Sequence, residues 1–186
     1  SGDWEVVLFE SDQINAFALP GGKIGVYTGI LKVTENQDQL AAIMGHEVGH
    51  VIANHSNERL SSNQAASVTQ QVAGALLGGQ DEQTKGYVLA GLGVGLQYGI
   101  LMPYGRAHER EADIIGQELM AKSGFNPKAA VDLWHNMAKA SESSPPEFMS
   151  THPSHETRIN KLSEHLAKTQ PMYKASKQQP KCYKPK

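Results

Sequence analysis

The chain has little cysteine, little excess charge and no long uninterrupted apolar run. Its single cysteine, Cys182, excludes an intramolecular disulfide framework and a cysteine zinc cluster. A formal net charge of −2 gives no reason to expect nucleic acid as a partner. No signal peptide is recognisable at Ser1, so we expect a processed or trimmed chain whose targeting segment has already been removed.

The remaining composition is that of an ordinary globular protein. The chain has 186 residues, of which 39% are hydrophobic, and this length predicts one domain with its own core. We expect a single domain over residues 1–170. A poorly ordered tail is expected over residues 171–186, where Lys, Gln and Pro are frequent.

Two stretches near the start of the chain have the composition of strands. Residues 4–9 and 23–33 are rich in β-branched and aromatic side chains. Pro20-Gly21-Gly22 is a turn signal, so residues 14–30 are predicted to form a hairpin. If one edge of this hairpin stays free, an extended peptide can pair with it, backbone to backbone.

The rest of the chain has helical patterns. Residues 56–102 are low in charge and rich in Gly and Ala, and they predict two packed helices around a polar break at residues 80–85. The apolar run of the second helix is expected to fall short of the twenty or so residues that span a bilayer, although a membrane-touching surface is the alternative interpretation. Further helices are predicted at residues 107–122, 127–140 and 156–169, with a loop at residues 141–154.

The pattern HExxH stands at His46-Glu47-Val48-Gly49-His50. Positions i and i+4 lie on the same face of a helix, so both imidazoles can bind one metal ion. Glu47 then lies beside them to hold and deprotonate a water molecule at the metal, as in zinc peptidases. The plainer alternative is a helix that carries two histidines by chance.

The surroundings of this pattern favour a metal-binding helix over chance. Asn36 is an N-cap candidate, and Gln39 follows it at the spacing of a capping box. Leu40, Ile43 and Met44 give the helix an apolar side. The fold class predicted from these elements is α+β and mostly α-helical, with the HExxH zinc helix packed beside a small antiparallel sheet or hairpin.

Two histidines leave a hydrolytic zinc site one protein ligand short, because such sites usually take three and keep a position for water. The extended pattern HExxHxxGxxH would need glycine at position 53 and histidine at position 56, where this chain has Ala53 and Ser56. His55 does not replace the missing histidine, since nine residues beyond His46 is about 180° further round a helix. We interpret His55 as a polar or supporting residue.

A glutamate from a later helix is the better candidate for the third ligand. Glu109 and Asp113 stand at i and i+4 and share a helix face. Glu109 can bind zinc while Asp113 accepts the outer N–H of a ligand histidine and fixes its tautomer. Glu111 is rotated by about 200° from Glu109 and is expected to face away. The alternative is a solvated charged helix face.

Four segments resemble, in this order, the bacterial envelope peptidases of the BepA, LoiP and YcaL type: NAFALPGGKIGVYTGIL, GHEVGHVIANH, EREADIIG and STHPSHETRI. These peptidases belong with HtpX and the mitochondrial Oma-type proteases among the gluzincin metallopeptidases. The resemblance covers roughly residues 4–165. YcaL-like or LoiP-like members are the closest expectation, because the chain ends without the tandem helical repeats of BepA.

The resemblance implies that His46, His50 and Glu109 bind zinc, that Glu47 is the general base, and that Asp113 supports a ligand histidine. It also implies a periplasmic location, often as an outer-membrane lipoprotein, and a role in clearing misassembled outer-membrane proteins. HtpX-like members place transmembrane helices between HExxH and the glutamate. Here the Gly-rich segments of that interval are expected to be too short and too interrupted to span.

In BepA-like proteins a histidine in a His-Pro loop can occupy the fourth zinc position and hold the enzyme latent. The matching residue is His152, and Arg158 follows at the family's spacing. From the residues alone, Pro145, Pro146 and Pro153 stiffen a loop that can deliver His152 to a site, and an ordinary loop histidine is the alternative. A catalytic role is a second alternative for His152. Arg158 is expected to order the loop, with an oxyanion role as its alternative.

We therefore predict a zinc-dependent endopeptidase that binds one Zn²⁺ per chain. Zinc polarises the scissile carbonyl and lowers the pKa of a water molecule towards ~7, and Glu47 takes the proton and returns it to the leaving amine. Expected partners are unfolded or misassembled protein substrates, the outer-membrane assembly machinery and, peripherally, a membrane.

The competing prediction is a zinc-stabilised periplasmic chaperone or interaction module that has latent or no proteolysis. A purely structural zinc needs no carboxylate at position 47, so Glu47 favours the enzyme. A third interpretation combines both roles, with His152 keeping hydrolysis off until a client protein docks.

Overall fold

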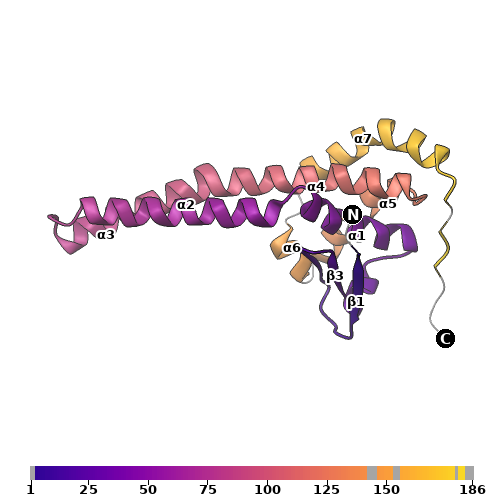
Figure 1. Cartoon of the computed structure of the whole chain (residues 1–186), viewed down its shortest axis with the longest axis horizontal. Coiled ribbons are helices and arrows are strands. Elements are labelled where there is room, and N and C mark those ends of the chain that lie inside the picture. Colours follow the sequence, from indigo (N-terminus) through magenta and orange to yellow (C-terminus); the bar gives the residue numbers. More distant parts are fainter. Residues whose placement is uncertain (1–2, 142–145, 153–155, 179, 183–186) are drawn as a thin grey trace. The chain divides into compact units, whose positions relative to one another are not determined.

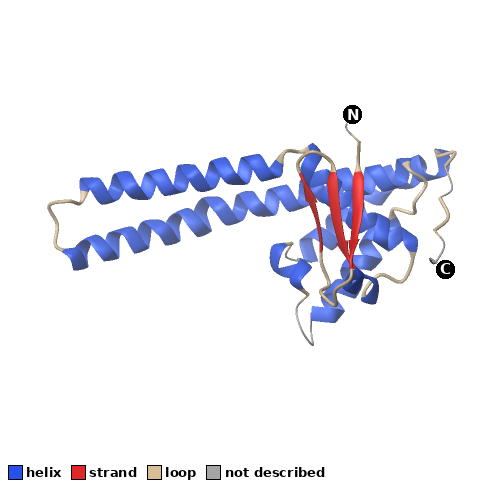
Figure 2. Cartoon of the chain, turned by 60° about the horizontal axis from the view of Figure 1, so that its bottom comes forward, coloured by secondary structure: helices blue, strands red, loops and turns tan. Residues whose placement is uncertain are grey.

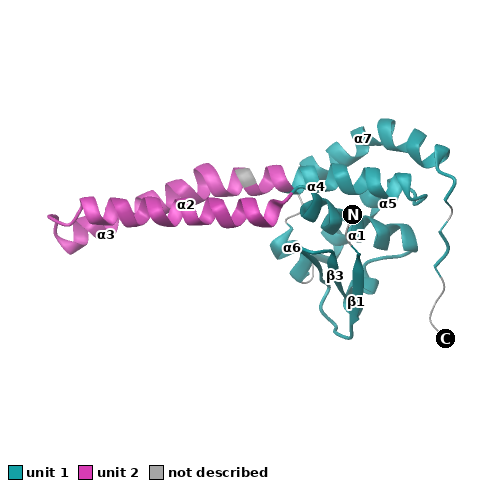
Figure 3. Ribbon diagram, viewed as in Figure 1, with its two compact units in different colours: residues 1–53, 109–186 teal, residues 54–108 magenta. Residues whose placement is uncertain are grey.

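The computed structural model describes residues 3–141, 146–152, 156–178 and 180–182. The chain forms two compact units, which Figure 3 shows in different colours. Unit 1 comprises Ser1–Ala53 and Glu109–Lys186, and unit 2 comprises Asn54–His108. Pro145 and Pro153, which the sequence places in the loop that carries His152, lie outside the described residues.

Unit 1 contains a three-stranded sheet in the order β1-β3-β2 (Figure 2). β2 (Ala16–Leu19) and β3 (Lys23–Tyr27) form the expected antiparallel hairpin. β1 (Glu5–Phe9) pairs with β3 in parallel, so the sheet is mixed where the sequence predicted an antiparallel one. The reason is the order of the strands, because β3 inserts between β1 and β2 and the hairpin pattern cannot specify this.

The stretch 23–33, expected as one strand, ends its pairing at Tyr27 and continues as the 3-10 helix η1 (Thr28–Lys32). At this point the Gly29 N–H donates to the Ser11 carbonyl at 2.8 Å. A Cβ on Gly29 would lie 2.3 Å from the carbonyl oxygen of Asp12. The chain turns here because the preceding loop packs directly on a residue without a side chain.

The helices that lie wholly or partly in unit 1 pack together beside this sheet (Figure 1). They are α1 (Gln37–Ile52), α4 (Met102–Lys122), α5 (Lys128–Ser141), α6 (Glu147–Thr151) and α7 (Glu156–Ala175). α6 lies within the predicted loop 141–154, because Phe148 is buried in the core and anchors a helical turn there. α7 extends six residues beyond the predicted helix and contains Pro171.

The core of unit 1 joins the sheet to α1, α5 and α7. Its largest members include Ile30, Ile43, Met137, Phe148 and Leu162, all nearly inaccessible to solvent. α1 begins at the expected N-cap, where the Asn36 side chain accepts a hydrogen bond from the Gln39 N–H at 3.0 Å. Ile43 is buried and Leu40 and Met44 pack against the core, as the apolar pattern predicted.

Small residues bring the backbones of α1 and α4 into contact. A Cβ on Gly45 would lie 2.9 Å from the Gly116 carbonyl oxygen, and one on Gly49 would lie 2.7 Å from that of Ala112. The four residues stand at i and i+4 on their respective helices, so they form one contact strip. Neither glycine can carry a side chain without separating the two helices, and those helices hold the histidines and Glu109.

Unit 2 is a helical hairpin of α2 (His55–Leu76) and α3 (Glu82–Leu96), followed by the π-helical turn η2 (Gln97–Leu101). Two helices with a break between them are found as predicted, but the break lies at residues 77–81 rather than 80–85. It ends at Asp81, whose side chain caps α3 by accepting a hydrogen bond from the Thr84 N–H at 2.9 Å. Glu82–Lys122 forms one helical run of 41 residues. By length and composition it is long and apolar enough to cross a membrane, contrary to our expectation, because its glycines do not interrupt the helix.

Candidate metal centre

His46, His50, Glu109 and His152 bring one ligand atom each into a single cluster, in which all four atoms lie within 4.8 Å of one another. His46 and His50 come from α1, Glu109 from α4 and His152 from the C-terminal end of α6. α6 fixes the position of His152, whose backbone N–H donates to the Phe148 carbonyl at 2.8 Å. The Phe148 ring also stacks on the His152 imidazole, with centroids 4.5 Å apart.

The distances within the cluster test whether these residues fit a metal ion. Nε2 of His46 lies 3.1 Å from Nε2 of His50 and 3.2 Å from Nδ1 of His152. The Glu109 carboxylate lies 3.3 Å from the nearest ring nitrogens of both His46 and His50, and 3.1 Å from Nδ1 of His152. Tetrahedral ligands held at about 2.0–2.1 Å from zinc are themselves about 3.3 Å apart. These distances therefore match the spacing of ligands around one ion, and all four ligand atoms stay within 4.8 Å of one another.

Asp113 and Arg158 lie behind this cluster. Oδ1 of Asp113 is 3.0 Å from Nδ1 of His46, so the carboxylate favours a proton on Nδ1, while Nε2 faces the other residues of the cluster. Arg158 is buried and donates from Nε and Nη2 to the two oxygens of Asp113, each at 2.7 Å. Its Nη1 lies 3.0 Å from Oε2 of Glu109, and its guanidinium lies 4.0 Å from the centre of the Trp134 ring.

Glu47 is buried, and its two carboxylate oxygens have different surroundings. Oε2 accepts a hydrogen bond from the Ala18 backbone N–H of β2 at 3.1 Å. Oε1 accepts none from any described residue, although Nε2 of His152 lies 3.4 Å away. One oxygen is thus held by the edge of the sheet, while the other remains available as a proton acceptor.

The protonation of the cluster follows from burial and from the carboxylates. Burial opposes the charge on His46, but the hydrogen bonds to Asp113 and Glu109 outweigh it and raise the pKa of His46 to about 9. Burial lowers the pKa of His50 to about 4. Hydrogen bonds from His152, His46 and His50 overcome the effect of burial and hold the pKa of Glu109 below its ordinary value. In the metal-free protein at neutral pH, His46 is charged, His50 is neutral and Glu109 is ionised.

The two carboxylates beside the cluster, Glu47 and Asp113, have pKa values shifted in opposite directions. Burial raises the pKa of Glu47, so this group holds a proton more readily than an exposed glutamate. Burial acts in the same direction on Asp113, but the charge and hydrogen bonds of Arg158 outweigh it and lower the pKa of Asp113. Asp113 therefore stays an anion that orients His46, whereas Glu47 is suited to exchanging a proton.

Two residues that were not expected to bind the metal, Glu111 and His55, lie outside the cluster. Glu111 is exposed on α4. His55 belongs to unit 2, where its ring stacks on that of His108 with centroids 4.1 Å apart. The sequence did not reveal that the Ala18 amide bonds to Glu47, although Ala18 lies in the first of the four resembling segments. It did not reveal the Trp134 ring either, because Trp134 lies in none of those segments. The small residues on α1 were detectable, since Gly45 and Gly49 directly precede the two HExxH histidines and stand at i and i+4.

The model of peptidase family M48 matches residues 1–166. The mitochondrial metalloendopeptidase OMA1 of Schizosaccharomyces pombe is 38% identical over 169 residues, which cover 90% of this chain and 48% of that protein. The beta-barrel assembly-enhancing protease of Yersinia pestis is 32% identical over 176 residues, which cover 92% of this chain and 36% of that protein. The chain thus spans about half the length of these relatives or less.

Proposed function

Given that the chain belongs to peptidase family M48, we propose that it is a zinc-dependent endopeptidase. The observation that carries this proposal is the cluster of His46, His50 and Glu109 beside a buried carboxylate, Glu47, with one oxygen free of hydrogen bonds among the described residues. Nitrogen and carboxylate donors in a tetrahedral set are those of zinc, and a structural site would have no use for the adjacent free carboxylate oxygen.

Each residue of the site has a separate task in the proposed reaction. A bound zinc ion supplies Lewis acidity, which polarises the scissile carbonyl and acidifies water. Oε1 of Glu47 accepts the proton of the attacking water and passes it to the nitrogen of the leaving amine, and its raised pKa suits both transfers. Asp113 holds His46 in the correct tautomer, and Arg158 holds Asp113. The buried position of Arg158 supports a positioning role rather than contact with substrate.

The edge of β2 is the proposed binding site for the substrate backbone. β2 is an edge strand, and the N–H of Ala18 points away from β3 and towards Glu47. An extended peptide that adds to this edge would run beside the general base. Ala18→Pro would also remove the hydrogen bond to Glu47, so the edge is better tested on the substrate side. Replacing single peptide amides by esters should raise KM at the positions that pair with β2.

The decisive experiment measures zinc content together with cleavage of casein by wild type and by Glu47→Gln. We expect one zinc per chain in both proteins and a rate about 10²–10⁴ times lower in the variant. Glu109→Ala should lose zinc as well as activity, whereas Glu111→Ala, on the exposed side of α4, should keep both. Equal rates of casein cleavage by wild type and by Glu47→Gln would refute the proposed endopeptidase activity.

The position of His152 supports a second candidate function. Its Nδ1 stands where a fourth ligand would, and a closed set of four protein donors is typical of structural zinc. A zinc-stabilised chaperone or interaction module would bind unfolded protein without cutting it, and Glu47→Gln would then change nothing. A latent peptidase reconciles the two, with His152 as a regulatory ligand that must leave before substrate enters.

We propose misfolded or misassembled envelope proteins as the substrates. The support is the relative named for beta-barrel assembly, together with the resemblance of the motifs to bacterial envelope peptidases. A periplasmic location, with attachment to the outer membrane as a lipoprotein, belongs to the same proposal, as does contact with the outer-membrane assembly machinery. Faster cleavage of an unfolded β-barrel protein than of casein would support this choice. Equal rates would favour a general protease.

A further inference from the structure

The helical hairpin of unit 2 has no charged residue along most of its length. No Asp, Glu, Lys or Arg occurs from Gly86 to Gly105, and none occurs from Leu60 on α2 to Gln80 in the turn that follows this helix. Charges stand only at the tip of the hairpin, at Asp81, Glu82 and Lys85, and at its base, at Glu58, Arg59 and Arg106. The uncharged stretch from Gly86 to Gly105 is twenty residues, which is about 30 Å of helix.

Large apolar side chains of this hairpin are exposed. In the part from α3 to the start of α4, Tyr87 is 71% exposed, Val94 58%, Tyr98 64% and Ile100 57%. The most apolar window of the run Glu82–Lys122 has none of its residues buried. On α2, four further apolar residues are exposed: Leu60, Val68, Val72 and Leu76. Soluble proteins rarely leave so much contiguous apolar surface in water.

α3 is apolar on both of its sides. Leu89, Leu92 and Leu96 are half-buried at i, i+3 and i+7, and a Cβ on Gly74 of α2 would touch Leu89, so this side packs on α2. Tyr87 and Val94, on the opposite side, are exposed. A helix that is apolar all round requires an apolar environment beyond its single partner helix.

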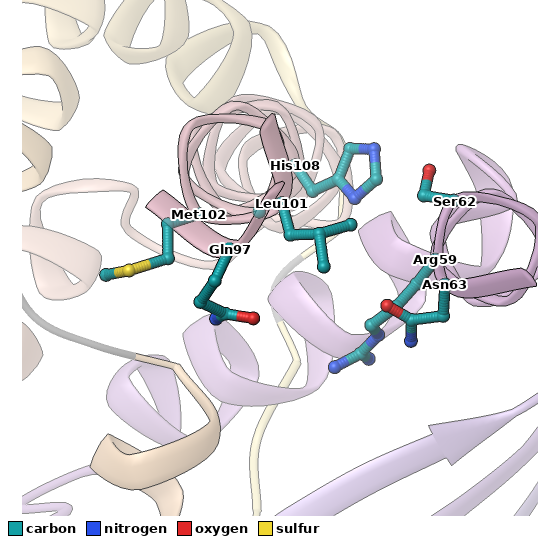
Figure 4. A pocket seen from close by; sticks show the side chains of 8 residues that line it. Arg59, Ser62, Asn63, Gln97, Leu101, Met102 and His108 are labelled. Atoms are coloured by element: carbon teal, nitrogen blue, oxygen red, sulfur yellow. The ribbon is translucent and has the colours of Figure 1, made fainter. Parts of the chain in front are cut away.

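α2 differs from α3 because it is rich in hydroxyl and amide side chains. They are Ser61, Ser62, Asn63, Gln64, Ser67, Thr69, Gln70 and Gln71. Figure 4 shows the base of the hairpin, where Arg59, Asn63 and Gln97 line a pocket together with His108. The apolar surface of the hairpin therefore ends in polar and charged residues both at its base and at its tip.

We propose that this hairpin lies in the surface of a lipid bilayer, with α3 immersed in the hydrocarbon boundary and α2 facing the water. The hairpin as a whole is amphipathic, because α3 is apolar on all sides and α2 is largely polar. A spanning arrangement would carry the three charges of the tip across the bilayer and surround the amides of α2 with lipid, which is costly. The in-plane arrangement leaves all of these groups in water.

A bilayer explains these observations better than a protein partner does. A partner covers one face of a helix and would require an apolar stripe, whereas hydrocarbon contacts every side of α3 that α2 leaves open. The absence of charge over twenty residues also matches a hydrocarbon environment, in which an isolated charged side chain is costly. Since the hairpin offers no basic stripe, binding should not need anionic lipid.

The first experiment is flotation of the 186-residue chain with neutral phosphatidylcholine vesicles. We expect the protein to float with the vesicles and to stay bound in 1 M NaCl, because burial of apolar surface is not screened by salt. Val94→Lys should weaken partitioning by about 10- to 100-fold. The matched control is Gln71→Lys, which adds the same charge to α2 and should bind as wild type does. Equal loss in both variants, or no flotation of wild type, would overturn the proposal.

The second experiment measures where each helix lies. An environment-sensitive fluorophore is attached to Val94→Cys or to Gln71→Cys, each in a Cys182→Ser background, and vesicles are added. The label at position 94 should shift to the blue and be quenched by brominated lipid, while the label at position 71 should remain accessible to aqueous iodide. Quenching by lipid at both positions would refute the in-plane arrangement in favour of a spanning hairpin. Iodide access at both, in a concentration-dependent dimer, would assign the surface to a second copy of the chain. Neither measurement requires proteolysis, so the result is independent of the proposed function.

Discussion

Arg158→Met tests how the metal centre is supported. The guanidinium is almost fully buried and makes two 2.7 Å hydrogen bonds to Asp113, as well as a 3.0 Å contact with Glu109. Methionine fills much of the same space beside Trp134 but removes the charge and all donors. Two buried carboxylates then lose one of the two cations that contact both of them, the other being charged His46, so the substitution should act on stability and on metal binding together.

The magnitude follows from the burial of both partners. Breaking a buried ion pair by removing one member costs about 3–5 kcal/mol, because the remaining charge is left without compensation. The side chains of Arg158 and Asp113 are 3% and 5% exposed, so solvent screening should reduce this cost little. Asp113→Asn should be comparably destabilising. The double variant should cost less than the sum of the two, by about 2 kcal/mol or more, since it leaves neither charge unpaired.

Urea denaturation of the four zinc-free proteins measures this cycle. Zinc affinity provides a second measurement, and both single variants should lower it by about 10- to 100-fold through the lost orientation of His46. If Arg158 instead served substrate directly, Arg158→Met would lower the rate while stability and zinc affinity stayed near wild type. Additive stability losses in the double variant would also refute the reasoning.

Three further predictions concern the helix contact, the fourth ligand and the proton on the cluster. Gly116→Ala should lower the free energy of unfolding by about 1–3 kcal/mol, because the added methyl group would lie 2.7 Å from the Gly45 backbone. Gly95→Ala is the control: its methyl group would meet open space, so in the same denaturation assay it should stabilise the helix by up to about 1 kcal/mol. His152→Ala should keep one zinc per chain and cleave faster than wild type in a peptide assay; a slower enzyme with zinc retained would assign His152 a catalytic role instead. Zinc affinity, measured by competition with a chelator, should rise about tenfold per pH unit from pH 7 and level off above the His46 pKa of about 9. The reason is that zinc binding must displace the proton on His46. An affinity independent of pH would contradict this. By the same raised pKa, the stability that charged His46 gives the metal-free fold should be complete below pH 6.5 and be lost as the pH rises through about 9.

The sequence predicted the elements that local patterns encode. The N-cap at Asn36, the hairpin around Gly21-Gly22 and the i, i+4 pairs on two helices all depend on residues close together in the chain. The face of α4 was predictable for the same reason, because a helix has a fixed period. Glu109 lies in the cluster and Glu111 is exposed, as the rotation of about 200° between them requires.

The features that the sequence did not predict depend on contacts between distant segments. The parallel pairing of β1 depends on which side of β3 it joins, and no local pattern fixes that choice. α6 forms because Phe148 enters a core built by other elements, so a proline-rich stretch that looked like a loop contains a helical turn. The length of the apolar helix was underestimated because its glycines were counted as breaks, whereas the helix continues through Gly99.

One side chain links the cluster of candidate ligands to Glu47, the proposed general base. Nδ1 of His152 lies among the ligand atoms, and its Nε2 lies 3.4 Å from Oε1 of Glu47. In the proposed latent state this single imidazole occupies both the fourth ligand position and the space in front of the base, where the attacking water would have to bind. Substrate and His152 therefore compete for the same space. Movement of the ring cannot open the fourth ligand position without also opening the space in front of Glu47. Any client that displaces His152 frees the metal and Glu47 in the same step, so activation of this site should be all-or-none for each molecule.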